Sequence, residues 1–299
     1  MQYVSLGNTG IKVSVIGIGT WQAGGKFWGS DVSDEAIIKA LIKAHALGIN
    51  LIATAEAYGD GHSEEVVGKA IREIGRDNVV VATAAANSAR RLGVSEIDLY
   101  QVHWPDPWEQ VPLRETMKAM ETLYKRGLIR AVGVSNFAVR DLKEAREHLS
   151  SVDIASNQVR YNMLQREIEE EVLPYCKREN ITILAWSPLA QGALTGKYGL
   201  GKKPSDEVRR GNKIFSDANL AELAKLIPTL EGIAKARKKT ISQVALNWLV
   251  EKGGVIPIPG AKNEEQAEEN AGAAGWSLTE DELSRIDRAL STVKINYYP

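Results

Sequence analysis

Two side chains in the sequence could exchange protons with a substrate near neutral pH, Tyr58 and His103. Tyr58 follows the short apolar run Leu51–Ala55, and His103 ends the run Leu99–His103. Runs of this length are typical of buried β-strands, so both side chains are expected where a strand passes into a loop. A phenol can donate a proton to an oxygen that gains negative charge, and an imidazole can donate or accept one. A lone strand-end histidine is more often a structural hydrogen bonder, but its position near a second such group favours a catalytic pair.

Eight strand-like runs occur along the chain, most of them separated by an amphipathic helical pattern. Strands that alternate with helices indicate a parallel sheet, and eight such units indicate a closed barrel. We therefore predict an α/β fold, a (β/α)8 TIM barrel that forms one domain over residues 1–299. The runs are Val15–Thr20, Leu51–Ala55, Val79–Thr83, Leu99–His103, Ala131–Ser135, Ile154–Gln158, Thr182–Trp186 and Val255–Pro259. Because the C-terminal strand ends of such a barrel form its mouth, Tyr58 and His103 are expected on one rim.

Local signals predict how several elements begin and end. Residues 3–6 and 11–14 alternate in polarity around a Gly-Asn-Thr-Gly turn, which predicts a β-hairpin that caps the bottom of the barrel. Ser33 and Thr279 are placed to cap the helices that follow them. The two prolines of the Val255–Pro259 run lack the N–H that a ladder needs, so this strand must be short.

Two connections have unusual lengths. The segment after the seventh strand, Pro188–Gly254, is far longer than the others, and its first part, Thr195–Phe215, predicts a surface loop over the mouth. The third crossover has only eleven residues, Ala86–Glu96, and Asn87–Gly93 resembles the last turns of a helix. Either the front of this helix is deleted, or further residues belong there that the printed sequence omits. We favour omission, because loss of half a barrel helix would expose strand surface.

Composition and charge narrow the classes of partner. With 299 residues, 44% apolar and 25% charged, the chain can bury a full barrel core. The formal net charge is -1 and the basic residues are scattered, so we expect neither nucleic acid nor membrane as a partner. No signal peptide and no long apolar span is visible, and we expect a cytoplasmic protein. The one cysteine, Cys176, is expected to be buried in a helix, and the histidines lack metal-ligand spacing, so no metal is expected.

Seven segments of the sequence resemble segments of the aldo-keto reductases, and they occur in the family's order over nearly the whole chain. They are IGIGTW, TAEAYG, RRLGVSEIDLYQVHWPD, GLIRAVGVSNF, NQVRYN, ILAWSPLAQGALTGKY and VIPIPGAKNEEQAEEN. The resemblance implies a (β/α)8 barrel and the reversible reduction of aldehydes and ketones by NADPH. It also implies that Tyr58 and His103 are two of four catalytic positions, and that the other two, an Asp and a Lys in the family, are Ala53 and Ala84 here.

The two alanines are expected to weaken proton transfer. A free phenol with a pKa near about 10 is a reluctant donor at neutral pH, and in the family a lysine cation, held by the carboxylate, assists it. We expect a loss of about 10² to 10⁴ in rate, while cofactor binding survives. The replacements are either natural or deliberate. Two other hypotheses stay open: a non-catalytic protein that binds a nicotinamide cofactor, and a barrel scaffold with an emptied, repurposed active site.

The resemblance also implies a binding site for NADP. Trp186 would stack on the nicotinamide ring, and polar side chains beside it would hold the carboxamide. Backbone amides of the turn after the seventh strand would wrap the pyrophosphate. Lys262, at the start of the helix after the eighth strand, offers a cation for the 2′-phosphate, so NADP is favoured over NAD. The full set is Ser135, Asn136, Gln158, Trp186, Ser187, Leu189, Gln191, Gly192, Ile258, Gly260, Lys262, Gln266, Glu269 and Asn270.

Four tryptophans are candidates for an aromatic wall around a small-molecule carbonyl substrate. Aromatic residues near a barrel mouth serve packing as often as recognition, and both interpretations stay open. The four are Trp21, Trp28, Trp104 and Trp108. The sequence does not distinguish a monomer from a homo-oligomer.

Overall fold

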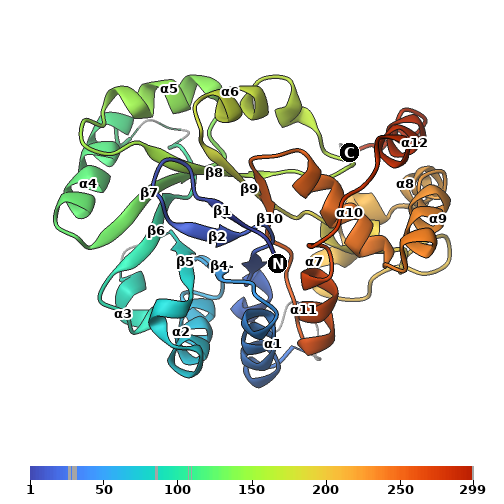
Figure 1. Ribbon diagram of the computed structural model, residues 1–299, viewed down its shortest axis with the longest axis horizontal. Helices are drawn as coiled ribbons and strands as arrows, with labels where there is room; N and C mark the ends of the chain where they lie inside the picture. Colours follow the sequence, from blue (N-terminus) through green and yellow to red (C-terminus); the bar gives the residue numbers. More distant parts are fainter. Residues whose placement is uncertain (26–27, 29–31, 85–86, 107, 109, 298–299) are drawn as a thin grey trace.

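The predicted eight-stranded barrel is confirmed. The computed structural model describes residues 1–25, 28, 32–84, 87–106, 108 and 110–297 (Figure 1). Its parallel strands are β3 (Ile18–Gly19), β4 (Leu51–Ala53), β5 (Val80–Thr83), β6 (Ile97–Val102), β7 (Ile129–Ser135), β8 (Ile154–Arg160), β9 (Thr182–Trp186) and β10 (Val255–Pro257). They form one sheet in sequence order from β3 to β10. Each predicted run therefore contributes a strand, with ends that differ by a few residues.

The first and last strands close the barrel with an incomplete set of hydrogen bonds. Gly17 and Gly19 donate backbone hydrogen bonds to the carbonyl oxygens of Pro257 and Pro259, each at 3.0 Å. An isolated parallel bridge joins Gly19 to Gly260. Because a proline has no N–H, neither Pro257 nor Pro259 can donate a hydrogen bond in return. The predicted shortness of the last strand is confirmed, since β10 ends at Pro257.

The N-terminal hairpin covers the end of the barrel opposite the mouth, as predicted. Its strands, β1 (Tyr3–Ser5) and β2 (Lys12–Ser14), pair antiparallel. In the turn between them, the N–H of Gly7 donates to the hydroxyl of Thr182, the first residue of β9, at 2.8 Å. Leu6 next to it is fully buried. The hairpin therefore closes the N-terminal end of the barrel and leaves the C-terminal end open for a site.

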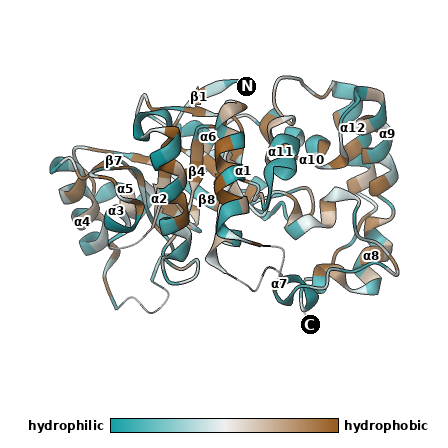
Figure 2. Ribbon diagram, turned by 90° about the horizontal axis from the view of Figure 1, so that it is seen from below, coloured by the Kyte–Doolittle hydropathy of each residue, from teal (hydrophilic) through white to brown (hydrophobic). Residues whose placement is uncertain are grey.

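Helices surround the sheet and turn their apolar sides toward it (Figure 2). The predicted caps are present: the hydroxyl of Ser33 accepts from the N–H of Ala36, and Thr279 forms a reciprocal capping box with Glu282. No helix in the described part of the chain is long and apolar enough to cross a bilayer. The helices are α1 (Asp34–Ala46), α2 (His62–Ile74), α3 (Ser88–Leu92), α4 (Leu113–Lys125), α5 (Val139–Glu147), α6 (Val172–Arg178), α7 (Glu207–Arg210), α8 (Asp217–Leu223), α9 (Ile227–Arg237), α10 (Ile241–Glu251), α11 (Glu264–Ala271) and α12 (Glu280–Leu290).

The third crossover is a short connection, and the favoured interpretation, that further residues belong in it, stays a prediction. The full sequence runs continuously through it, and its helix is α3, with five residues. The expected exposure of strand surface is partly observed, because Tyr100 and Val102 on β6 are only half-buried. An ion pair spans this region: the guanidinium of Arg91 on α3 contacts the fully buried carboxylate of Glu64 on α2. Ala86, where the crossover was predicted to begin, lies outside the described residues.

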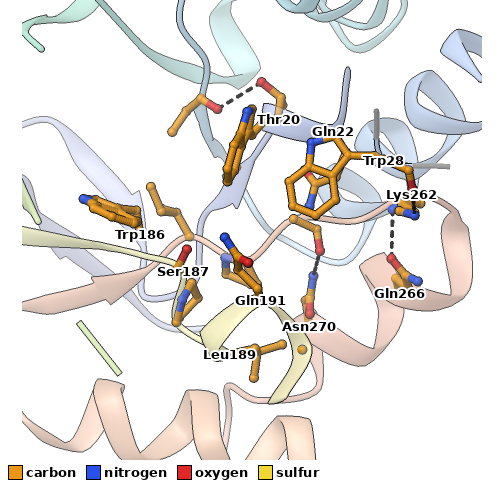
Figure 3. Close-up of a pocket in the computed structure, with 18 of the residues that line it drawn as sticks. Thr20, Gln22, Trp28, Trp186, Ser187, Leu189, Gln191, Lys262, Gln266 and Asn270 are labelled. Atoms are coloured by element: carbon orange, nitrogen blue, oxygen red, sulfur yellow. Dashed lines mark hydrogen bonds between the residues drawn. The ribbon is translucent and has the colours of Figure 1, made fainter. Parts of the chain in front are cut away.

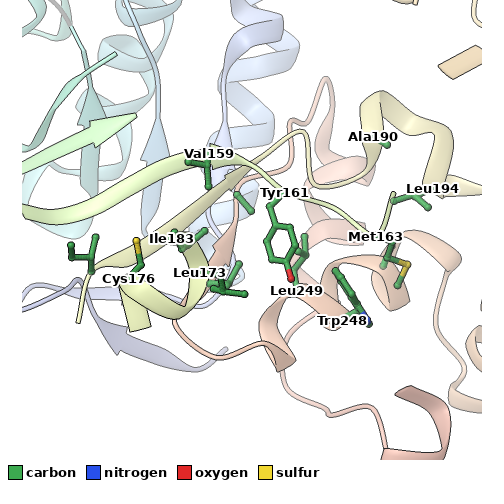
Figure 4. Packing of buried hydrophobic residues seen from close by; sticks show 14 of the residues in the cluster. Val159, Tyr161, Met163, Leu173, Cys176, Ile183, Ala190, Leu194, Trp248 and Leu249 are labelled. Atoms are coloured by element: carbon green, nitrogen blue, oxygen red, sulfur yellow. The ribbon is translucent and has the colours of Figure 1, made fainter. Parts of the chain in front are cut away.

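The long connection after β9 is more ordered than the predicted surface loop. It contains η5 (Ala190–Thr195), α7 and η6 (Lys213–Phe215), and both Ile214 and Phe215 are buried. A large apolar cluster holds its start (Figure 4). In this cluster Ala190 and Leu194 of η5 pack with Tyr161, Trp248 and Leu249. The wall that η5 gives to the mouth is therefore fixed by the core.

Cys176 is a structural residue, as predicted. It lies on α6 with its side chain fully buried in the same apolar cluster. Burial raises the pKa of its thiol to about 12. Because the thiolate is the reactive form, this cysteine is unsuited to nucleophilic chemistry.

Candidate active site

A pocket of about 530 Å³ opens among the C-terminal ends of the barrel strands. It is lined by Ala53, Tyr58 and His103 and by all fourteen residues expected to hold a cofactor. These residues come from strands and loops spread over most of the sequence. The structure therefore brings the predicted site together at the mouth, with one exception, Ala84.

Tyr58 and His103 face each other across the pocket. Their ring centroids are 6.4 Å apart and the rings are nearly perpendicular, at 84°. The loop that carries Tyr58 depends on Gly59, which has φ of +67°, and a Cβ there would lie 2.0 Å from the carbonyl oxygen of Gly24. Only glycine allows this close approach, which presses the Tyr58 loop against η1 (Trp21–Gly24).

Burial keeps both groups of this pair neutral near pH 7. It raises the pKa of the Tyr58 phenol to about 12 and lowers the pKa of the His103 imidazole below its usual value. Desolvation is the cause of both shifts, because it penalises the charged form of either group. The pair can thus offer two neutral hydrogen-bond donors to a bound oxygen.

Of the two alanine positions, Ala53 lies on the interior side of the barrel. Alternate residues of a strand point inward, and the interior cluster contains Leu51 and Ala53 of β4 and Val80 and Ala82 of β5. Ala53 is buried and lines the pocket. Ala84 follows this alternation two residues after Ala82, is half-buried just beyond β5, and does not line the pocket. The charged side chains among the described lining residues come from other elements: Lys197, Arg209, Lys262 and Glu269.

Polar side chains at the ends of β7, β8 and β9 form one interlocked group. The indole N–H of Trp186 donates to Oδ1 of Asn136 at 3.2 Å, and the amide of Asn136 donates to the carbonyl oxygen of His103 at 3.1 Å. Nε2 of Gln101 donates to Oε1 of Gln158 at 3.1 Å, and Ser135 donates to the backbone oxygen of Gln158 at 2.7 Å. These bonds fix the orientation of the side chains. With its oxygen occupied, the Gln158 amide can present its NH₂ to an acceptor.

The turn after β9 has an unusual backbone. Ser187, Ala190 and Gln191 have positive φ although none of them is glycine, and Gly192 has φ of +101°. Such conformations cost free energy and occur mainly at functional sites. The N–H groups of Ala190 and Gly192 donate to the carbonyl oxygens of Ser187 and Leu189, each at 2.9 Å, so the turn is held by its own backbone hydrogen bonds.

The third part of the pocket is the start of α11. Figure 3 shows Trp186 at one end of the pocket, Lys262 and Gln266 at the other, and Ser187, Leu189 and Gln191 between them. Gln266 accepts from the N–H of Lys262 at 2.9 Å, and Asn270 donates to the carbonyl oxygen of Gly260 at 3.1 Å. The Lys262 ammonium also donates to the carbonyl oxygen of Trp28, from the first βα loop. The distance between the ends suits an elongated ligand with a polar group at each end.

Three of the four candidate tryptophans line the pocket. Trp21, Trp28 and Trp104 do so, and the rings of Trp21 and Trp28 meet edge to face with centroids 4.9 Å apart. Trp108 does not line it and is 78% exposed. The expected aromatic wall is therefore formed without Trp108.

Several residues that line the pocket were not predicted from the sequence. Lys197 and Tyr198 end a segment that resembles the family, but only neighbouring residues in that segment were predicted to bind the cofactor. Arg209 lies in the long connection, where its guanidinium stacks over Trp28 and Tyr198, and no spacing signal indicated it. Ser242 and Gln22 likewise reach the pocket through tertiary packing alone. Among the described residues, no group of three or more His, Cys, Asp or Glu could hold a metal ion.

Comparisons with known proteins match this geometry. The chain is 38% identical to the aldo-keto reductase YhdN of Bacillus subtilis, over 97% of this chain and 94% of that protein. A glycerol dehydrogenase from Gluconobacter oxydans superposes with a TM-score of 0.86, 32% identity and coverage of 97% and 95%. An aldo-keto reductase from Klebsiella pneumoniae, solved with NADPH, superposes with a TM-score of 0.77, 32% identity and coverage of 96% and 95%.

The model of the Aldo/keto reductase family matches in two parts, residues 15–87 and 83–291. The parts meet in the third crossover, where α3 is short. The match is divided at this connection and covers both sides of it. The chain belongs to the aldo/keto reductase family.

Proposed function

We propose that this protein is an NADP(H)-dependent oxidoreductase that reduces aldehydes or ketones to alcohols, with weakened proton-transfer machinery. One observation carries the proposal: Tyr58 and His103 face each other in the same pocket as the whole expected cofactor-binding set. Family membership supports the reaction class. The aromatic wall of Trp21, Trp28 and Trp104 suits an apolar carbonyl compound.

The residues present fit NADP(H). The fixed amides near Trp186 suit a carboxamide, and the start of α11 with Lys262 suits a 2′-phosphate. The turn at Ser187–Gly192 lines the pocket between these two ends, where the diphosphate would lie (Figure 3). Helix α11 strengthens the fit to a 2′-phosphate, because its N-cap Asn263 is followed by N–H groups and a positive dipole end. Bound NADPH would supply a hydride to the carbonyl carbon.

The proposed role of Tyr58 is to donate the proton that the carbonyl oxygen needs as negative charge develops on it. His103, kept neutral by burial, would donate a second hydrogen bond and orient the carbonyl. The raised pKa of Tyr58, about 12, makes its phenol a slow donor. At Ala84 there is no ammonium to lower that pKa, and at Ala53 there is no carboxylate to hold such an ammonium in place. The proposed activity is therefore slow and not abolished.

The decisive experiment restores the two missing groups. NADPH binding is titrated by quenching of tryptophan fluorescence, and NADPH oxidation is followed with a panel of aldehydes and ketones. In Ala53→Asp/Ala84→Lys we expect a gain of about 10² to 10⁴ in the rate of reduction, with little change in NADPH affinity. The matched control, Ala53→Asn/Ala84→Met, has similar side-chain volumes without charge and should show no gain. If the charged variant binds NADPH and gains nothing, the assignment of these positions is wrong.

A non-catalytic binding protein is the second candidate function. Two observations favour it: all the residues expected to bind the cofactor line the pocket, and the pKa of the Tyr58 phenol is raised to about 12. It predicts tight NADPH binding and no turnover of any carbonyl compound at any pH. If NADPH does not bind at all, the third hypothesis, a barrel with a repurposed pocket, is favoured.

A further inference from the structure

One hydroxyl in the pocket wall has no hydrogen-bond partner. The side chain of Ser242 is buried, with the residue 1% exposed, and its Oγ is the buried side-chain polar atom of the described residues that lacks a partner. Ser242 nevertheless lines the pocket. Burial of an unsatisfied hydroxyl costs free energy, so such an atom at a pocket surface calls for a ligand.

The local structure explains why the protein itself does not satisfy this hydroxyl. Ser242 is the second residue of α10, and the capping role is already taken by Thr240, whose Oγ1 accepts from the N–H of Gln243 at 3.2 Å. A serine inside a helix can bond to the carbonyl three or four residues before it. Here those residues precede the helix, and one of them, Lys238, has φ of +55°. Its carbonyl is therefore not aligned with the helix.

The position of α10 indicates which part of an elongated ligand would meet Ser242. Helix α10 packs against both η5, which forms the middle of the pocket wall, and α11, which forms the far end. Trp248 and Leu249 of α10 lie in the same apolar cluster as Ala190 and Leu194 of η5 (Figure 4). The serine is thus held rigidly by a helix that packs against both the middle and the far end of the pocket wall.

We infer that Ser242 is a further cofactor-binding residue, whose hydroxyl donates a hydrogen bond to the diphosphate bridge of NADP(H). The inference rests on the proposed function, because it requires the cofactor to lie along η5 and α11. Phosphate oxygens only accept, so the hydroxyl is the donor. The N-terminal end of α10 adds a favourable dipole for the same charge. Lys197, which lines the pocket and also lies beside Thr240 and Gln243, brings a cation to this region.

The test compares Ser242→Ala with the unaltered protein in binding and in stability. We expect NADPH to bind about tenfold more weakly, the effect of one hydrogen bond to a charged acceptor. Binding of 2′-AMP, which has the adenosine and 2′-phosphate without the diphosphate, should not change. The unfolding midpoint without ligand should stay the same or rise, because the substitution removes an unsatisfied buried hydroxyl.

Ser14→Ala is the matched control. Ser14 is equally buried, but its hydroxyl is bonded to Ile16 and Asn50 at the opposite end of the barrel. Its removal should lower the unfolding midpoint and leave NADPH affinity unchanged.

The outcomes separate this inference from the proposed function. Unchanged NADPH affinity in Ser242→Ala overturns the inference and leaves the proposed function intact. If the unfolding midpoint of that variant also falls, the Ser242 hydroxyl has a structural role. Equal weakening of NADPH and 2′-AMP overturns the assignment to the diphosphate. Failure of the unaltered protein to bind NADPH overturns both proposals together.

Discussion

The two sides of the pocket differ sharply in their chemistry. The side built from β7, β8, β9 and α11 is polar and interlocked, with Asn136, Trp186 and Gln158 each fixed by hydrogen bonds. The opposite side has the methyl group of Ala53 on β4, and Ala84 lies half-buried just beyond β5 without lining the pocket. The resemblance to the family implies an Asp and a Lys at these two positions. The comparison teaches that the proposed cofactor binding and the proposed proton transfer would depend on separate strands of one barrel, so that either could be weakened without disturbing the other.

The barrel tolerates the two alanines because strand pairing is a backbone property. Ala53 keeps its register opposite Gly19 and Ala82, and its carbonyl accepts from the N–H and the hydroxyl of Thr20. None of these bonds uses the side chain. The β4 and β5 side of the pocket thus keeps its shape while its chemistry changes.

The largest expected effect is on stability, and it concerns the ion pair that supports the β4 and β5 side of the pocket. Arg91 contacts Glu56 at 3.0 Å as well as the buried Glu64, which accepts from the hydroxyl of Thr83 at the end of β5. Arg91→Ala leaves a buried carboxylate without its cation, and we expect a loss of about 3 kcal/mol in the free energy of unfolding, measured by urea denaturation. The double variant Arg91→Met/Glu64→Gln should recover a large part of this loss. A single-variant loss below about 1 kcal/mol would show that this ion pair does not hold the short crossover.

The next largest expected effect is on cofactor affinity, and it concerns the polar side of the pocket. Lys262→Glu should weaken NADPH binding by about 10²-fold, because it removes a cation from the expected 2′-phosphate site and adds repulsion. NADH, which lacks this phosphate, is the internal control and should be affected far less. Equal weakening of both cofactors would mean that Lys262 acts only through its hydrogen bond to the Trp28 carbonyl.

A smaller effect concerns the remaining proton donor. Tyr58→Phe should reduce the slow carbonyl reduction by about tenfold and leave NADPH affinity unchanged, since the phenol contributes to proton transfer alone. Tyr198→Phe is the matched control, because Tyr198 lines the same pocket and stacks edge to face on Phe215. Equal activity of Tyr58→Phe and the unaltered protein would remove Tyr58 from the mechanism.

The smallest effect is in the pH profile. His103 has a lowered pKa and is neutral above its ordinary value of about 6.5, and Tyr58 stays protonated up to about pH 12. The rate of reduction should therefore be flat between about pH 7 and pH 10. In Ala53→Asp/Ala84→Lys the new ammonium lowers the pKa of Tyr58, so the rate should begin to fall at a lower pH. Superimposable profiles of the two proteins would contradict the expectation that a lysine at position 84 reaches the phenol.

Much of the fold could be predicted because its signals are local. Each strand run is a buried apolar segment, and caps such as Ser33 and Thr279 act within one helical turn. The support of the third crossover could not be predicted for the opposite reason. Its short helix is supported by the long-range contact between Arg91 and Glu64, and no pattern within Ala86–Glu96 reveals a partner on α2.

The sequence by itself determined the order of the strands, the parity that turns Ala53 inward, and the absence of a carboxylate and an ammonium at Ala53 and Ala84, since these follow from residue identity and the two-residue period of a strand. Only the tertiary structure decided that the ring centroids of Tyr58 and His103 lie 6.4 Å apart, that Trp108 is exposed and does not line the pocket, and that the pocket wall contains a Ser242 hydroxyl without a partner. These facts depend on how segments that are distant in the sequence pack around the barrel mouth. Closure of the sheet decides which of these residues come into contact, and their separation along the chain does not.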